Sequence, residues 1–353
     1  MSKSPALTAP DAARAVRLAF VIPWRDRGGW VWEYLRDQHY CGDLLFAAPE
    51  PGAFLDRRRW LPPYIAELVH LAARRPHLDA YDVLFAWELR TALAVAVLRR
   101  FQSASRRAAF VPVGPILKGP ANRALPLVRW LLRDADRIVC FSRAECETQA
   151  RLLSLPAERF LFVPTPWRAD EPVAQEDGRY ILALGHSGRD YPLLLDAVRG
   201  TDLPVVIVAR SPSDLGAGTV PQNVTVRYNT GHHETNALIA GATFHVIPLQ
   251  DTDYSAGQTV LLRAMARGKA VVVTSTVGVR DYVRDGETAV LVPPGNVEAL
   301  RTALQGLWND AQTQGRIGRA AVEAAKETSG FPQFARHLVE IAEGLLTDAK
   351  GAT

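Results

Sequence analysis

The feature that most constrains the fold of this chain is a series of twelve short apolar runs, which form two groups of six. The runs lie at 17–23, 43–48, 82–87, 108–113, 137–142 and 160–164, and then at 179–185, 203–209, 223–228, 243–249, 269–274 and 289–294. Each is nearly continuous in Val, Leu, Ile and Phe, which is typical of parallel strands that are buried on both faces. Helical patterns such as 88–100 and 123–135 separate them, and this repeated order favours right-handed crossovers. The sequence therefore predicts an α/β protein with two doubly wound, Rossmann-like domains that face a cleft.

A polar stretch with two prolines and no hydrophobic periodicity, 165–178, separates the two groups and indicates a linker. The Ala-rich start of the chain is expected to be a disordered leader, and its amphipathic end predicts a helix that packs back on the N-terminal domain. The predicted order is a leader over 1–16, an N-terminal domain over 17–165, a linker over 166–178, a C-terminal domain over 179–330 and a last helix over 331–353.

The composition indicates a globular protein from a reducing compartment. Hydrophobic residues make up 48% and charged residues 22% of the chain, which excludes disordered and fibrous classes. The three cysteines form no CxxC pair and no cluster with histidine, so neither a disulfide framework nor a metal site is predicted. No apolar run reaches the roughly 20 residues that span a bilayer. We expect a cytoplasmic protein without metal or cofactor, and peripheral contact with the inner face of the membrane stays open.

The charge is unevenly divided along the chain. Residues 1–165 carry 24 Lys and Arg against 16 Asp and Glu, whereas the remainder carries 17 against 21. This favours anionic partners for the N-terminal half, but no basic and aromatic motif of a nucleic-acid reader occurs, so no nucleic acid is predicted. Arg123, Arg129, Arg133 and Trp130, with RRRW at 57–60, fit docking to anionic lipid head groups. A solvated charged face is the simpler interpretation.

The segment from Tyr254 to Gly295 carries the strongest indication of a ligand. It contains a glycine loop, a short apolar helix, a buried strand and a second glycine turn, in that order. Gly257, Gln258 and Thr259 stand at the start of the helix, where unpaired N–H groups and the helix dipole favour an anion. In an open α/β sheet this position lies in the crevice beyond the strand ends, so a phosphorylated ligand is expected.

The chain resembles the family 4 glycosyltransferases, which have the GT-B fold, over most of its length and most specifically over 180–300 in the C-terminal half. The matching segments are LLRAMARGKAVVVT (261–274), VGVRDYVRDGETAVLVPPGNVEAL (277–300), GHSGRDYPLLLDAV (185–198), DADRIVCFSRAECETQ (134–149), LFVPTP (161–166) and the pair Gly28-Gly29. The resemblance implies that a nucleotide-diphosphate sugar binds in the cleft, mostly to the C-terminal domain. It also implies transfer, retaining as in most of the family, to a hydroxyl of a carbohydrate, lipid or small-molecule acceptor.

The resemblance also implies roles for single residues. Arg189 stands where the family has a lysine that contacts the diphosphate, and a cation there stabilises the charge that develops on the leaving group. His186 and Ser187 in the same loop would assist. Gly28 and Gly29, after the first strand, would line the pocket.

Two elements of the family pattern are missing, one on the acceptor side and one on the donor side. Many relatives have a histidine at the end of the strand 82–87, where this chain has Trp87 followed by Glu88. Glu88 is therefore the candidate for orienting or deprotonating the acceptor hydroxyl. The Glu-x7-Glu motif of the family reads Ser255 and Arg263 here, so both carboxylates are absent. Since arginine cannot accept a hydrogen bond from a ribose hydroxyl, three alternatives are open: the sugar donor is bound differently, with Gln258 and Thr259 taking over polar contacts, the donor is unusual, or catalysis is lost.

Other functions are consistent with parts of the pattern. A binding protein that has lost catalysis and a nucleotide-sugar epimerase on the same fold remain open. A dinucleotide-dependent oxidoreductase is disfavoured, because no GxGxxG follows any predicted strand.

Overall fold

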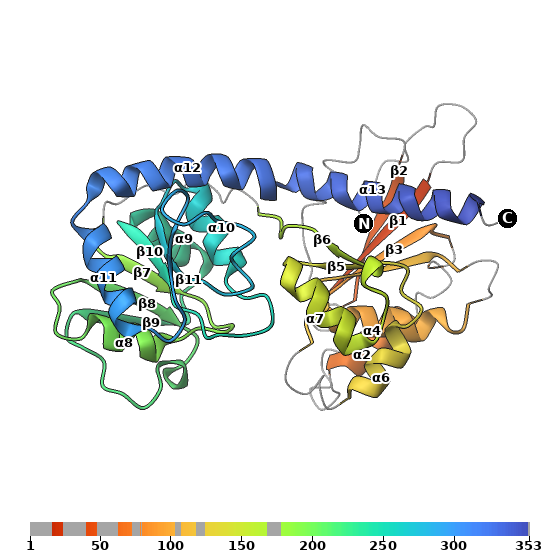
Figure 1. Cartoon of the computed structure of the whole chain (residues 1–353). Helices are drawn as coiled ribbons and strands as arrows, with labels where there is room; N and C mark the ends of the chain where they lie inside the picture. Colours follow the sequence, from red (N-terminus) through yellow and green to blue (C-terminus); the bar gives the residue numbers. More distant parts are fainter. Residues whose placement is uncertain are drawn as a thin grey trace.

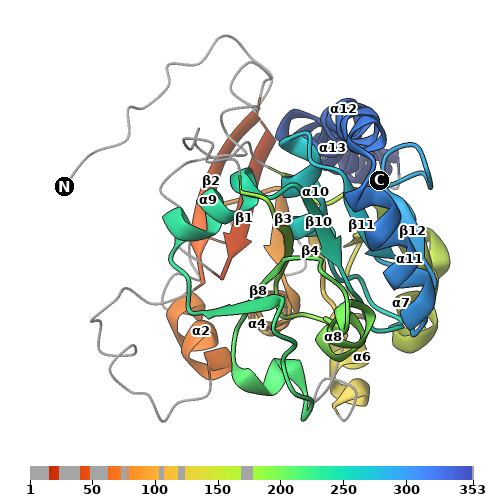
Figure 2. The same ribbon diagram turned by 90° about the vertical axis from the view of Figure 1, so that its left-hand side faces the viewer.

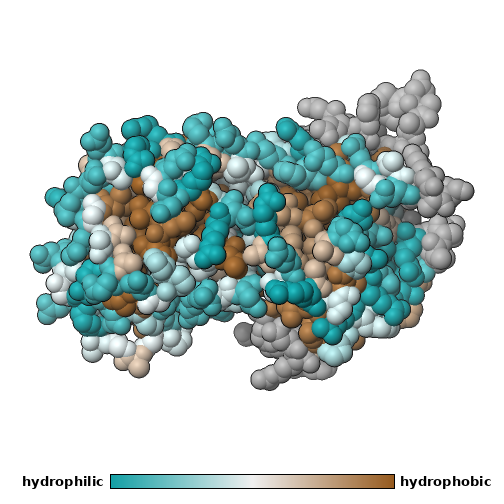
Figure 3. Space-filling model, viewed as in Figure 1, coloured by the Kyte–Doolittle hydropathy of each residue, from teal (hydrophilic) through white to brown (hydrophobic). Residues whose placement is uncertain are grey.

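The structure, a computed structural model, describes residues 16–23, 40–47, 63–72, 78, 80–102, 107–117, 124–167 and 178–351. Two six-stranded parallel sheets, one from each half of the chain, lie side by side with helices on both faces (Figure 1). Apolar residues gather in each half, and hydrophilic residues lie around and between them (Figure 3). The predicted fold class, with two doubly wound sheets, is confirmed.

The first sheet has the strand order β2-β1-β3-β4-β5-β6. Its strands are β1 (Val16–Ile22), β2 (Tyr40–Phe46), β3 (Val83–Trp87), β4 (Ala109–Val113), β5 (Ile138–Cys140) and β6 (Phe160–Phe162). One face packs on the helices α2 (Pro63–Ala72), α4 (Leu89–Arg99), α6 (Leu125–Leu132) and α7 (Arg143–Leu153). Each strand overlaps one of the predicted apolar runs.

The second sheet has the strand order β12-β11-β10-β7-β8-β9. Its strands are β7 (Ile181–Leu184), β8 (Val205–Ala209), β9 (Val224–Tyr228), β10 (Phe244–Ile247), β11 (Val271–Thr274) and β12 (Val290–Val292). The helices of this half are α8 (Tyr191–Val198), α9 (His232–Gly241), α10 (Gln258–Ala266), α11 (Val297–Trp308) and α12 (Ala311–Ser329). Here too every strand falls within a predicted run.

Two consecutive helices join the halves. The helix α12 runs along the second half, and α13 (Phe331–Gly351) continues across the first sheet (Figures 1 and 2). Leu338 and Ala342 of α13 are buried in one cluster with Phe20 and Phe85 of the first sheet. The sequence analysis did not predict α12, because the helix is rich in polar residues and its buried face consists largely of alanine and glycine. Small residues there let α12 approach closely: a Cβ on Gly318 would lie 2.0 Å from the carbonyl oxygen of Gly268.

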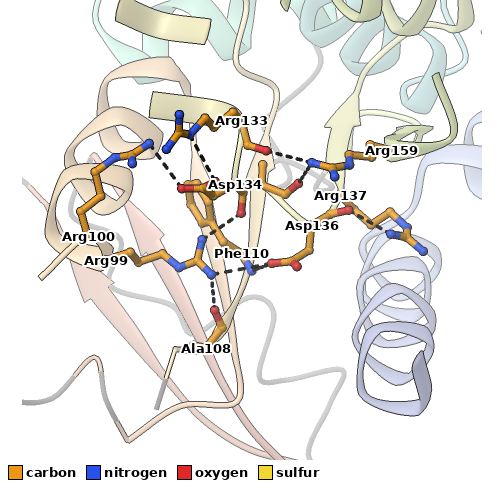
Figure 4. A network of polar contacts seen from close by, with 10 residues as sticks. Arg99, Arg100, Ala108, Phe110, Arg133, Asp134, Asp136, Arg137 and Arg159 are labelled. Atoms are coloured by element: carbon orange, nitrogen blue, oxygen red, sulfur yellow. Dashed lines mark hydrogen bonds and ion pairs between the residues drawn. The ribbon is translucent and has the colours of Figure 1, made fainter. Parts of the chain in front are cut away.

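A buried arginine ties the helices of the first half to its sheet (Figure 4). Arg99, at the end of α4, donates to the carbonyl oxygens of Asp134 at 3.2 Å and Ala108 at 2.5 Å. Its guanidinium lies 3.7 Å from the Asp136 carboxylate, which also accepts a hydrogen bond from the Phe110 amide at 2.7 Å. The guanidinium centre stands 4.9 Å from the centroid of the Phe110 ring. These contacts all join residues of the first half.

Several predictions fall outside the described residues: the leader over 1–15, the pair Gly28 and Gly29, the basic run at 57–60, Arg123 and most of the linker. In the part of the chain that the structure describes, no helix has both the length and the apolar character needed to cross a bilayer.

Candidate functional site

The strand order of the second sheet creates a crevice between β7 and β10. The chain passes outward through β7, β8 and β9, then returns to β10 beside β7 and continues through β11 to β12. Loops that leave adjacent strands in opposite directions open a crevice at the carboxyl edge of a parallel sheet. Backbone bonds join these two loops, from Gln250 N to Gly188 O at 2.9 Å and from Asp190 N to Pro248 O at 3.0 Å. The fold thus fixes the two loops against each other.

A cleft of about 630 Å³ lies at this crevice and reaches the first half. Its lining residues are Trp87, Glu88, Ile116, Phe141, Thr165, Pro166, Gly185, His186, Ser187, Arg189, Ser255, Ala256, Gly257, Gln258, Thr259, Val260 and Phe331. The cleft therefore brings together eight residues that the sequence predicted for the site. Of the remaining three, Gly28 and Gly29 lie outside the described residues, and Arg263 is not among those that line the cleft.

Arg189 is buried in the floor of the cleft, with 8% of its surface exposed. Its Nε donates to the carbonyl oxygen of Leu184 and one terminal nitrogen to that of Ser187, both at 2.9 Å. Gly185, with φ of 104°, makes room for this side chain, since a Cβ there would lie 2.4 Å from the guanidinium. Burial lowers the pKa of Arg189 from its usual value, but a guanidinium stays protonated at neutral pH. Among the described residues, no carboxylate forms an ion pair with it.

The start of α10 lies beside Arg189 in the cleft lining. Gly257 precedes the helix with φ of 92°, a left-handed conformation that glycine adopts without strain. The first N–H groups of a helix have no partner within it, and the dipole there favours negative charge. Gln258 is 6% exposed, and its Nε2 has no hydrogen-bond partner among the described residues. Thr259 follows and is exposed. The first N–H groups of α10 and the Gln258 amide can therefore donate hydrogen bonds to an anion in the cleft.

Ser255 and Arg263, at the positions expected for the family's two glutamates, are placed differently. Ser255 lines the cleft and is buried. Its hydroxyl donates at 2.9 Å to Glu145, a residue of the first half. Arg263 instead points to α9, where its guanidinium donates at 2.5 Å to the side-chain oxygen of Asn236. That amide also lies 3.1 Å from His232. The sequence grouped Ser255 and Arg263 as donor-binding residues, but only Ser255 lies on the cleft surface.

Glu88 faces the cleft from the end of β3. Its backbone has φ of 65° and ψ of 159°, and its N–H donates at 2.9 Å to Val113 of the next strand. This conformation costs a non-glycine residue about 1–3 kcal/mol and tends to occur at functional sites. The side chain makes no capping bond to α4, although it stands at the N-cap position. Helix capping therefore does not explain a glutamate at this position.

Sequence reasoning missed the apolar wall of the cleft and the contacts beneath it. Ile116, Phe141 and Phe331 come from three separate segments of the chain, and no local pattern marks them as neighbours. Glu145 was missed because its contact with Ser255 joins residues 110 positions apart. Within the described ranges, no three His, Cys, Asp or Glu side chains are arranged to hold a metal ion.

Comparison with known proteins connects this geometry to a family. Residues 189–310 match the family described as glycosyl transferases group 1. The chain has the GT-B fold and resembles the group 1 glycosyl transferases. D-rhamnosyltransferase WbpZ of Pseudomonas aeruginosa is 33% identical over 136 residues, which are 36% of this chain and 35% of the relative. The match thus spans about a third of the length of that relative.

Several solved structures share the whole architecture. A glycosyltransferase from Rickettsia africae superposes with a TM-score of 0.70 at 13% identity, covering 95% of this chain and 99% of that one. Sucrose-phosphate synthase from Thermosynechococcus elongatus gives 0.71 at 17% identity, covering 94% and 100%. Anabaena HepE in complex with UDP-glucose gives 0.64 at 13% identity, covering 93% and 99%. At these identities the likeness concerns the fold.

Proposed function

We propose that this protein is a glycosyltransferase that moves a sugar from a nucleotide-diphosphate sugar to a hydroxyl of an acceptor. The family match over 189–310 begins at Arg189, within the loop after β7, and includes the whole loop between β10 and α10. HepE, which shares the fold, is described in complex with UDP-glucose. The acceptor would be a carbohydrate, a lipid or a small molecule that enters from the first half.

The observation that carries this proposal is the buried, unpaired cation in the cleft. A buried charge is costly unless a counter-charge and hydrogen bonds compensate it. Arg189 has two carbonyl partners and, among the described residues, no carboxylate. A diphosphate would supply the missing charge, and a guanidinium binds two phosphate oxygens at once. The Gln258 amide and the N-terminus of α10 line the same cleft and would bind further oxygens.

In the reaction that we propose, the bond between the anomeric carbon and the diphosphate oxygen breaks as the acceptor oxygen bonds to that carbon. Arg189 and α10 would stabilise the charge that accumulates on the leaving diphosphate. For a retaining transfer, the departing phosphate oxygen takes the acceptor proton. Glu88 would hold the acceptor hydroxyl by accepting a hydrogen bond from it.

The test is a binding and transfer assay with purified protein. A panel of nucleotide diphosphates and their sugars is followed by thermal shift, since a ligand of the folded state raises stability with its affinity. Arg189→Ala should remove the shift, and Arg284→Ala is a matched control, because Arg284 is exposed and paired with Glu287. Equal shifts in wild type and Arg189→Ala would remove Arg189 from the site. No shift with any donor in the wild type would refute the function.

A second candidate is a binding protein that has lost catalysis. It is favoured by the cleft lining, in which Glu88 is the one carboxylate among the described residues and Ser255 stands where the family resemblance would place an acid. Release of nucleotide diphosphate from the sugar donor, with and without acceptors, separates the two. Binding without any release over long incubation would favour the second candidate.

Peripheral membrane contact is a further part of the proposal. Leu127 and Trp130 on α6 are 56% and 46% exposed. The guanidinium centre of Arg100 lies 3.7 Å from the centroid of the Trp130 ring, and that of Arg133 lies 5.9 Å from it. Apolar and cationic groups that lie together at α6 and the end of α4 favour an anionic lipid surface. Sedimentation with anionic vesicles, but not zwitterionic ones, is expected, and Leu127→Ser with Trp130→Ser should abolish it. Unchanged sedimentation of that variant would contradict this contact.

A further inference from the structure

Beneath the cleft, the carboxylate of Glu145 joins the two halves of the molecule. Glu145 belongs to the first turn of α7 and is 1% exposed. Its Oε2 accepts from the hydroxyl of Ser255 at 2.9 Å and from the amide of Phe141 at 3.1 Å. Its Oε1 accepts from the Ser255 amide at 3.4 Å. Among the described residues it has no ion pair, so hydrogen bonds alone compensate its burial.

Helix capping explains only part of this arrangement. Ser142 is the N-cap of α7 and accepts from the Glu145 amide at 3.1 Å, while Glu145 accepts in return from Phe141. Such reciprocal bonds resemble a capping box, which can form on an exposed helix. They do not require that the carboxylate be buried or that it contact Ser255. The two bonds to Ser255 therefore indicate a second role.

Ser255 lies in the loop that leads into α10. It lines the cleft two residues before Gly257 and three before the first residue of α10. The backbone of the next residue, Ala256, packs closely against Gly278 on the other side, because a Cβ on Gly278 would lie 2.6 Å from the Ala256 amide nitrogen. The backbone before α10 is thus held between Glu145 and Gly278. A shift there would move the N–H groups at the start of α10.

The surrounding contacts show that the joint between the halves lies at this place. The hydroxyl of Tyr282 donates at 2.7 Å to the Phe141 carbonyl. The amide of Arg143 donates at 2.8 Å to Asp281. Tyr282 and Asp281 belong to the second half, and their partners Phe141 and Arg143 lie four and two residues before Glu145 in the sequence. The hydrogen bonds of the Glu145 carboxylate therefore depend on how the two halves are arranged, because its partners come from both.

We propose that Glu145 is a positioning residue of the donor site, which acts through Ser255 and supplies from the first half the carboxylate that this loop lacks. It fixes the segment 254–257, and with it the start of α10, when the two halves are together. The effect on the donor rests on the proposed function; the effect on the loop does not. Glu145→Gln tests it sharply, since the amide nitrogen would face an N–H group and cannot accept from it.

The experiment measures both effects on the folded protein. In Glu145→Gln without ligand, amide hydrogen exchange over 255–258 should become about 10-fold faster or more, as expected when a hydrogen bond to a charged group is lost. The donor KM should rise about 10-fold, with kcat changed much less, because binding geometry rather than chemistry is altered. Asp281→Asn is the matched control, since it removes the other carboxylate of the joint without a contact to Ser255. It should leave exchange over 255–258 and the donor KM unchanged.

A relocation variant guards against a general loss of structure. Glu145→Ser combined with Ser255→Glu moves the carboxylate to the loop and should restore part of the donor affinity that Glu145→Ser loses. Unchanged exchange in Glu145→Gln would overturn the positioning role. Faster exchange with an unchanged donor KM would overturn the role in donor binding. A wild type that binds no nucleotide-diphosphate sugar would refute the proposed function, while the exchange result would still decide whether Glu145 fixes the loop.

Discussion

Two buried arginines, one in each half of the molecule, have opposite surroundings. Arg99 in the first half has a carboxylate at 3.7 Å, two carbonyl oxygens and an aromatic ring (Figure 4). Arg189 in the second half has two carbonyl oxygens and lines the cleft. Burial lowers the pKa of Arg99 to about 10 and lowers that of Arg189 as well, yet both stay charged at neutral pH. Arg99 is compensated within the fold, whereas Arg189 would be compensated by a ligand.

A buried histidine in the second half differs from Arg189 in how it avoids a buried charge. His245 lies in β10 and is fully buried, and burial lowers its pKa to about 3. An imidazole without a counter-ion can release its proton, which a guanidinium cannot do at neutral pH. Arg189 therefore needs an anion in a way that His245 does not.

The largest effect is expected from Arg189→Ala. Loss of a charge-assisted donor to the leaving group should lower kcat/KM for the sugar donor by about 10²–10³-fold. The unfolding free energy without ligand should change by less than about 1 kcal/mol, because an unpaired buried charge contributes little to stability. Steady-state kinetics and urea unfolding measure the two. A large loss of stability with normal donor kinetics would show that Arg189, like Arg99, is structural.

Arg99→Met should show the opposite pattern. It keeps the packing of the side chain but leaves Asp136 and two carbonyl oxygens without their donor, so the unfolding free energy should fall by about 2–3 kcal/mol. The dissociation constant of the donor, measured by calorimetry at a temperature where both proteins are folded, should stay unchanged. Weaker donor binding in this variant would break the contrast between the two arginines.

His245 should make stability depend on pH. Because its pKa in the folded state is lowered to about 3 from the usual 6.5, the unfolded state binds the proton more tightly. The stability that neutral His245 gives is fully present above pH 6.5 and is lost as the pH falls towards 3, by up to about 1.4 kcal/mol per pH unit. Urea unfolding between pH 7 and 5 should show this slope, and His245→Gln should reduce it. An equal slope in both proteins would assign it to other groups.

Glu88→Gly should give a small change in stability, and that change should be a gain. Glycine adopts φ of 65° without strain, so the unfolding free energy should rise by about 1 kcal/mol. Transfer should weaken, because the carboxylate that would hold the acceptor is lost. Glu88→Gln keeps the strain and also loses the carboxylate, so it should be less active without being more stable. If Glu88→Gly transfers sugar at the normal rate, Glu88 has no part in the reaction.

The parts that sequence could predict are those in which a local pattern determines the structure. The strands of both sheets were found because buried parallel strands are continuously apolar. The start of α10 was found because Gly257 and the following apolar residues form a loop and a helix within a few positions. The long helix α12 was missed, since it is polar on average and its buried face consists largely of alanine and glycine, which mark a helix less clearly than large apolar residues do.

Within the candidate site, the limit of prediction was long-range contact. Sequence placed Ser255 and Arg263 together by analogy with a motif, but the side chain of Arg263 bonds to Asn236 on α9. It gave no sign of Glu145, because that residue looks like an ordinary first-turn glutamate until the two halves are brought together. Residues whose partners lie within one loop were predictable; those whose partners come from the other half were not.

The passage of α13 across the first sheet has a consequence for biosynthesis. The first half emerges early from the ribosome, yet the side chains that cover one face of its sheet, such as Phe334 and Leu338, are translated only after the whole second half. Until then that face is an exposed apolar surface, available to chaperones or to unwanted partners. Because synthesis runs from the N-terminus, one face of the first sheet stays uncovered at first. Its core is complete only when α13 packs on it.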